Sequence, residues 1–166
     1  PATLDRVYDF GAEAFDSIID TLRNSVPCIV LDVPHQWAGW TRRLLVSADD
    51  ILVVASPDLA NLRNAKNMVD LLRVARPNDH RPYYCLNQVG VPKRPEITPA
   101  DFAKALEDKP VAVIPFEPQI FGTAANNGQM IAEVSGNHKT AEMFRQLAQI
   151  LTGRTETKKS RASLLM

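Results

Sequence analysis

The chain has 166 residues, 45% of them apolar, and its 19 basic and 19 acidic residues cancel to a net charge of zero at pH 7. This length and apolar content predict one domain with its own core, and they exclude an intrinsically disordered chain. The balanced charge excludes a global electrostatic attraction to nucleic acid, so we expect no nucleic-acid partner.

The first third of the chain predicts a helix, a strand and a second helix. Apolar residues recur with the helical period over 9–24, which predicts a helix with one buried stripe. The run 26–33 (VPCIVLDV) is apolar and β-branched without alternation, and such a run is typical of a strand buried on both faces of a parallel sheet. A second helix is expected over 40–48.

The rest of the chain alternates strands and helices. A strand is predicted over 51–55, and Ser56 as N-cap with Pro57 at the first helical position predicts a helix that Pro77 ends. Strands are further predicted over 83–86 and 111–114, and helices over 99–106, 119–125 and 138–151, the last capped by Asn137 and closed by Gly153.

This alternation predicts βαβ crossovers, and therefore an α/β fold with a parallel sheet of about four strands flanked by helices. We assign residues 1–153 to this domain and residues 154–166 to a basic tail that we expect to be flexible. Two cysteines in apolar runs, Cys28 and Cys85, are typical of free thiols in a reducing cytoplasm. No apolar run approaches the ~20 residues of a membrane span and no signal peptide is seen, so we expect a cytoplasmic protein.

Polar residues follow several of the predicted strands, at the sheet edge where ligands of open parallel sheets bind. Asp32 ends the strand predicted over 26–33, and a carboxylate there could hold a magnesium-bound water beside a phosphate chain. For this residue taken alone, the favoured interpretation is that Asp32 accepts hydrogen bonds from the turn that follows. No cluster of His, Cys, Asp and Glu has the spacing of a metal site, so we expect no metal site built by this chain alone.

Taken together, four tracts resemble the MinD/ParA family of deviant phosphate-loop ATPases. They are CIVLDVP, ILVVASPDLANLRNAKNMVDLL, YYCLNQV and VIPFEPQIFGTAANNGQMI, and the resemblance covers roughly residues 8–152. In the family, the first is an acidic motif in which an apolar strand ends in Asp-x-Pro, and the last two surround the adenine base. Within the family, the His-Gln-Trp after Asp-x-Pro and the tract IPFEP…AANNGQ most resemble the Flp/Tad pilus assembly proteins of the CpaE/TadZ type.

The resemblance implies ATP and Mg²⁺ as ligands of an intact parent protein, with Asp32 holding the magnesium-bound water. It implies that the residues on the adenine side are Asn87, Gln88, Pro115, Phe116, Glu117 and Pro118, the last four through their backbone. It also implies a homodimer that assembles and positions a pilus or secretion machine by binding its proteins.

The departures from the family are as informative. A phosphate loop needs Gly-x-x-x-x-Gly-Lys-Ser/Thr, but none of the seven glycines is followed by lysine. We therefore expect this chain alone to be inactive as an ATPase and to bind no nucleotide tightly. The bulky stretch 35–40 (HQWAGW) stands where the family has its switch glycine, which argues against hydrolysis even by an intact parent.

The chain begins at Pro1, not methionine, which indicates a piece of a longer protein. In the family the phosphate-loop strand lies beside the strand that ends at Asp32, so we expect the sheet to lack one strand. An unpaired buried edge is costly, because its N–H and C=O groups need partners. We expect the gap to be closed by a second copy, by rearrangement or by upstream residues.

Two other functional classes fit the sequence less well. A receiver domain would be phosphorylated on Asp32. Such domains carry a lysine at the end of their last strand, but here Lys109 precedes the strand predicted over 111–114. A dinucleotide-binding enzyme is excluded by the absence of Gly-x-Gly-x-x-Gly. In the tail, a basic run precedes an apolar end and predicts weak membrane-surface contact; the residues are Lys158, Lys159, Arg161, Leu164, Leu165 and Met166.

Overall fold

The computed structural model describes residues 12–34 and 38–153. The chain separates into two compact units, Pro1–Ala48 and Asp49–Met166. The predicted domain over 1–153 spans both units and stays a prediction. The basic tail and His-Gln-Trp at 35–37 lie outside the described residues. None of the helices in the described part is long and apolar enough to cross a membrane.

The first unit contains two of the predicted helices, α1 (Ala12–Arg23) and α2 (Gly39–Ser47). The rings of Phe15 on α1 and Trp40 on α2 pack with their centroids 5.4 Å apart. Asp16 and Arg43 form an exposed ion pair at 3.7 Å between the same helices. Both helices are therefore confirmed over their described residues, and their contact is partly aromatic.

The strand predicted over 26–33 is not formed. Residues 26–34 are in neither helix nor strand, and the Val30 side chain is 90% exposed. A strand exists only where a neighbouring strand takes its N–H and C=O groups, and no described residue pairs with this run. Within the described residues the sheet accordingly has three strands where about four were expected, and the prediction of a strand ending at Asp32 is wrong.

The second unit is built on a parallel sheet with strand order β1-β2-β3. The strands are β1 (Leu52–Ala55), β2 (Tyr83–Val89) and β3 (Ala112–Pro115). Both pairings are parallel, which confirms the α/β fold with a parallel sheet. No described strand pairs with the outer edge of β1, where Val54 is 58% exposed. What covers this edge stays a prediction.

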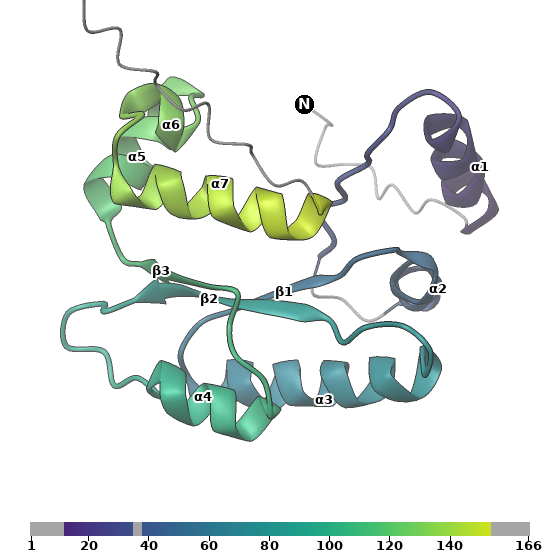
Figure 1. Ribbon diagram of the computed structural model, residues 1–166, viewed down its shortest axis with the longest axis horizontal. Coiled ribbons are helices and arrows are strands. Elements are labelled where there is room, and N and C mark those ends of the chain that lie inside the picture. The colour runs from purple at the N-terminus through teal and green to yellow at the C-terminus, as the bar shows by residue number, and fades with distance from the viewer. Residues whose placement is uncertain (1–11, 35–37, 154–166) are drawn as a thin grey trace, which may run out of the picture. The chain divides into compact units, whose positions relative to one another are not determined.

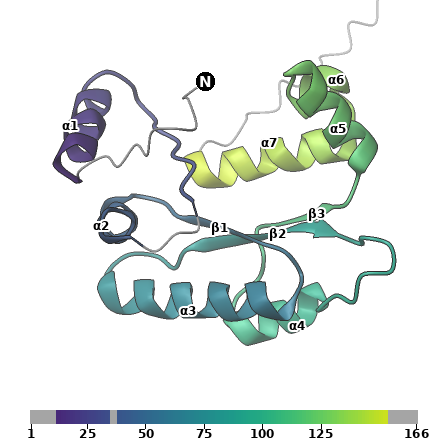
Figure 2. The same ribbon diagram turned by 180° about the vertical axis from the view of Figure 1, so that it is seen from behind.

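Helices flank both faces of this sheet. On one face lie α3 (Leu59–Ala75) and α4 (Pro99–Leu106), and on the other lies α7 (Lys139–Thr152), as Figure 1 shows. Figure 2 gives the same arrangement from behind, with α5 (Pro118–Asn127) and α6 (Ile131–Val134) on the side of α7. The bounds of α4 match the prediction, whereas α6 was not predicted.

Two apolar layers, one on each face of the sheet, form most of the core of this unit, and a third buried cluster lies among α5, α6 and α7. Successive side chains of a strand point to opposite faces, so Tyr84 and Leu86 join Phe102 in the layer beneath α3 and α4. Cys85 joins Leu147 in the layer beneath α7. Burial raises the pKa of the Cys85 thiol to about 11.

The two cysteines are expected to differ strongly in reactivity towards a thiol reagent at pH 8. Cys28 is exposed, whereas Cys85 is 1% exposed and, with its raised pKa of about 11, carries roughly one thiolate in a thousand. We expect one fast thiol per chain, and a Cys28→Ser variant that reacts only as fast as it unfolds. Two equally fast thiols in the native wild type would contradict the placement of Cys85.

Candidate functional site

The carboxyl ends of the three strands meet at one edge of the sheet, which we call the carboxyl edge. The N–H of Phe116, after β3, donates to the carbonyl of Val89 at the end of β2 (2.8 Å). The N–H of Ile97 donates to the carbonyl of Pro57, after β1 (2.8 Å). These bonds join the segments that follow each strand into one continuous surface, where ligands of open α/β sheets bind.

Two of the predicted site residues, Asn87 and Gln88, form a β-bulge near the end of β2. The pairing of β2 with β3 shifts register between Leu86 and Val89. Gln88 has φ of 56°, a left-handed conformation that costs a non-glycine residue on the order of 1–2 kcal/mol. The Asn87 Oδ1 accepts the Gln88 N–H at 2.9 Å, which fixes the amide plane. Such bulges re-aim side chains and are frequent beside active sites.

The turn after the bulge is organised by Arg94 and Glu96, which sequence reasoning missed. The Glu96 carboxylate accepts the N–H groups of Gly90 (2.9 Å) and Val91 (3.1 Å) and the guanidinium of Arg94 (2.9 Å). The Gly90 N–H, and after it the Arg94 guanidinium, hold the pKa of Glu96 below its ordinary value. The sequence signal was weak, since a glycine followed by an Arg-x-Glu spacing is common in loops.

The predicted run Pro115–Phe116–Glu117–Pro118 connects β3 to α5 at the carboxyl edge. Pro118 occupies the first helical turn, and Phe116 is 36% exposed. The Glu117 carboxylate does not cap α5 but accepts the hydroxyl of Thr140 on α7. The His138 Nδ1 lies 3.9 Å from the same carboxylate oxygen. Phe116 is thus left facing solvent at the edge, while Glu117 is fastened to the N-terminus of α7.

His138, not Asn137, is the N-cap of α7, and its ring nitrogen accepts the Thr140 N–H at 3.2 Å. The N-cap prediction is therefore corrected by one residue. The physical reason is that a neutral imidazole nitrogen is also a hydrogen-bond acceptor, so that either of two adjacent residues could cap this helix. Gly153 closes α7 in the left-handed conformation, as predicted.

The helix that follows β1 begins later than predicted. Asp58, not Ser56, is the N-cap of α3, and its carboxylate accepts the Asn61 backbone N–H at 2.8 Å and the Asn61 side-chain amide. The backbone N–H of Asn61 above all, with its side-chain amide and Arg94, lowers the pKa of Asp58. Pro57 is buried before the helix begins and does not start it.

We expect Asp58→Ala to lower the free energy of unfolding by about 1 kcal/mol at pH 7, because the N-cap is lost. The folded-state pKa lies below the ordinary 3.8, so this stabilisation is full above that value and is lost as pH falls through the lowered pKa. Asp58→Asn is the matched control, since asparagine caps equally well but does not titrate. Urea titrations of the three proteins between pH 2 and 7 measure both effects.

Asp32 lies in the first unit, is exposed and does not end a strand. Two predicted roles of Asp32, in a magnesium site or as a phosphoacceptor, required it to stand at the end of a strand. The structure does not place Asp32 at such a position. Among the described residues, no group of three or more His, Cys, Asp or Glu side chains could hold a metal ion. Of the predicted site residues, the structure therefore brings Asn87, Gln88 and residues 115–118 to the carboxyl edge, whereas Asp32 lies in the other unit.

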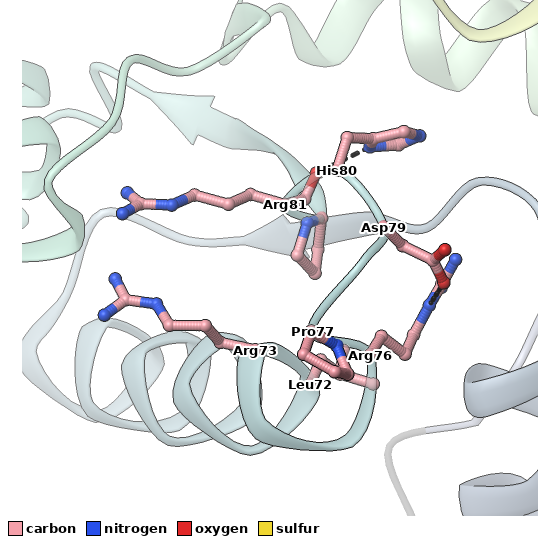
Figure 3. Close-up of a pocket in the computed structure, with 8 residues that line it drawn as sticks. Leu72, Arg73, Arg76, Pro77, Asp79, His80 and Arg81 are labelled. Carbon is pink, nitrogen blue, oxygen red and sulfur yellow. Dashed lines mark hydrogen bonds and ion pairs between the residues drawn. The ribbon is translucent and has the colours of Figure 1, made fainter.

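A pocket of about 270 Å³ lies at the opposite edge of the sheet, before β2 begins (Figure 3). Its lining residues are Leu72, Arg73, Arg76, Pro77, Asp79, His80, Arg81 and Pro82. Each of its cations has an oxygen partner: Arg76 contacts Asp79 at 2.7 Å, Arg73 contacts Glu107 at 3.4 Å, and Arg81 donates to the Glu107 carbonyl at 3.2 Å. These arginines thus bind oxygen atoms at the ends of α3 and α4.

No protein-family model and no curated protein sequence matches the chain. Several solved structures have the same fold. One is the ParA family ATPase from Chlorobium tepidum, which is 19% identical with a TM-score of 0.72, and the alignment covers 89% of this chain and 60% of that one. Another is the septum site-determining protein MinD from Pyrococcus horikoshii, complexed with Mg-ADP (20%, TM-score 0.70, 84% and 56%). A third is MinD in the MinC:MinD cell division protein complex of Aquifex aeolicus (19%, TM-score 0.70, 87% and 60%).

The fold is thus that of the MinD/ParA-type phosphate-loop ATPases, as the sequence predicted. At these identities the likeness establishes the fold alone, and the chain spans about 60% of the length of the structures it matches.

Proposed function

We propose that this chain carries the base-recognition half of an adenine nucleotide site and belongs to a MinD/ParA-like ATPase that is complete only with further residues. The single observation behind the proposal is the meeting of the Asn87–Gln88 bulge and the exposed Phe116 segment at the carboxyl edge. A planar base needs in-plane hydrogen-bond partners and an apolar surface to lie against. The Asn87 amide and Phe116 supply one of each.

In this proposal Asn87, with Gln88, faces the edge of the base, and the backbone of residues 115–118 contacts it. The Mg-ADP bound to the MinD of P. horikoshii is consistent with this class of ligand. The residues present fit the base but not the phosphates, since no lysine-bearing glycine loop occurs in the sequence. In an intact parent in which the run 26–33 pairs as a strand, Asp32 would hold the magnesium-bound water, and Mg²⁺ would neutralise phosphate charge.

The cellular role that we propose is the assembly and positioning of a pilus or secretion machine, by homodimerisation and contacts with its proteins. The motivation is the resemblance of the tracts at 32–37 and 114–129 to the Flp/Tad pilus assembly group. The A. aeolicus MinD was solved with a partner, MinC, which is consistent with action through protein contacts. We place the protein in the cytoplasm, with weak membrane-surface contact through residues 155–166.

Titration of the chain with adenosine and with ATP tests the nucleotide proposal. We expect both ligands to bind weakly and about equally, with no dependence on Mg²⁺, because the phosphates have no partner here. In heteronuclear NMR spectra the shifted resonances should belong to residues 87–90 and 115–118. Asn87→Ala should weaken binding about tenfold, as expected for the loss of a polar group that contacts the ligand.

Two outcomes would contradict the proposal. One is the absence of any shift at the carboxyl edge at millimolar adenosine. The other is tight, Mg²⁺-dependent binding of ATP, which would mean that the chain has a phosphate site of another kind. The pilus role is tested separately, by co-purification of the full-length parent with pilus assembly proteins and by its mass in solution.

A further inference from the structure

The bulge at Asn87 and Gln88 is held in place from outside the sheet. The guanidinium of Arg94 donates a hydrogen bond to the carbonyl oxygen of Gln88. This is the point at which the register between β2 and β3 shifts. Arg94 therefore supplies a charged donor where the regular ladder is interrupted.

Glu96 in turn fixes the guanidinium of Arg94. One carboxylate oxygen accepts from the Arg94 Nε at 3.2 Å and from its Nη2 at 2.9 Å. The same carboxylate accepts the N–H groups of Gly90 and Val91. The side chains of Arg94 and Glu96 are 27% and 18% exposed, so water competes only partly for these bonds. One carboxylate thus links the turn after β2 to the arginine that holds the bulge.

The backbone of this loop needs such support. Gln88 and Lys93 have φ of 56° and 63°, conformations that side-chain-bearing residues adopt rarely. Strained backbone of this kind persists where the surrounding contacts over-determine it, and it gathers at ligand sites. Here Arg94 holds the carbonyl of Gln88, and Glu96 holds both Arg94 and the N–H groups of Gly90 and Val91.

We propose that Arg94 and Glu96 are positioning residues that fix the bulge and, through it, the aim of the Asn87 amide at the carboxyl edge. Neither residue needs to touch a ligand, because Arg94 acts through Gln88 and Asn87. The ligand part of this inference rests on the proposed function, whereas the effect on the Asn87 amide does not.

The variants that test it are Arg94→Ala, Arg94→Lys and Glu96→Gln, with Arg73→Ala as matched control. Lysine keeps the charge but lacks the planar fork that reaches Gln88 and Glu96 together. Glutamine keeps one acceptor oxygen for the Gly90 and Val91 N–H groups. The control Arg73→Ala removes another arginine–glutamate ion pair, the one with Glu107 at the opposite edge of the sheet.

Two readouts are measured on the full chain: the NMR resonances of the Asn87 side-chain amide and Gln88 N–H without ligand, and the affinity for adenosine. We expect Arg94→Ala to shift these resonances and to weaken adenosine binding about tenfold, the effect of one charge-assisted hydrogen bond. Arg94→Lys and Glu96→Gln should give smaller changes in the same direction, and Arg73→Ala neither. Far-UV circular dichroism confirms that each variant is folded.

The inference is overturned if the Asn87 and Gln88 resonances stay in place in both Arg94 variants and in Glu96→Gln. It is also overturned if Arg73→Ala moves them as much, since the effect would then be general loss of stability. If the wild type shows no adenosine binding, the proposed function fails, and the resonances alone still decide whether Arg94 and Glu96 position Asn87.

Discussion

Phe102→Ala is expected to lower the free energy of unfolding by about 3–5 kcal/mol. Phe102 is 0% exposed and packs against Tyr84, with ring centroids 5.9 Å apart, in the layer beneath α3 and α4. Truncation removes the ring from its apolar surroundings and leaves a cavity that the two helices and the sheet can close only in part. Since the free energy of unfolding of small domains is about 5–15 kcal/mol, this one substitution removes a large part of it.

Urea unfolding followed by far-UV circular dichroism measures this loss. Circular dichroism is the suitable probe because both tryptophans, Trp37 and Trp40, precede the unit that contains Phe102. Phe102→Leu should cost clearly less, since it keeps most of the apolar volume. Val74→Ala is the surface control, because Val74 is 82% exposed and its truncation should change stability by no more than about 0.5 kcal/mol. Equal losses for Phe102→Ala and Val74→Ala would contradict this core.

The sequence predicted the elements of the second unit well because their signals are local. The proline at the start of α4 and the glycine after α7 mark helix ends without reference to the rest of the chain. The N-caps of α3 and α7 were misplaced because nearby residues also carry hydrogen-bond acceptors, and the helices use Asp58 and His138. The strand predicted over 26–33 is absent for a different reason, since an apolar β-branched run becomes a strand only beside a partner strand.

The candidate site shows the same division. Positions after predicted strands located Asn87, Gln88 and residues 115–118 at one sheet edge, since parallel strands end on the same side. Arg94 and Glu96 were not predicted as site residues, because they stabilise a turn whose left-handed residues have no clear sequence signature. Thr140 escaped because it lies 23 positions from Glu117 and meets it only after α7 has packed on the sheet.

The contact between Thr140 and Glu117 provides the second large expected effect. Thr140 is 1% exposed, and its hydroxyl donates a hydrogen bond to the Glu117 carboxylate. A hydrogen bond to a charged group stabilises by about 1.5–3 kcal/mol. The Glu117 side chain is 35% exposed, so water weakens the interaction, and we expect Thr140→Val to cost about 1–2 kcal/mol.

A double-mutant cycle separates this bond from other consequences of the substitutions. Thr140→Val keeps the shape of the side chain and removes the hydroxyl, and Glu117→Gln keeps the length of its partner and removes the charge. If the bond stabilises the fold, the double variant should lose less than the sum of the single losses. Thr152→Val is the control on the same helix, because its hydroxyl bonds only the exposed carbonyl of Ala148 and should cost little. Because glutamine still offers an acceptor oxygen, the cycle isolates the part of the bond that depends on the charge of Glu117, and additive losses would mean that this charge does not strengthen the hold of α7 on the Phe116 segment.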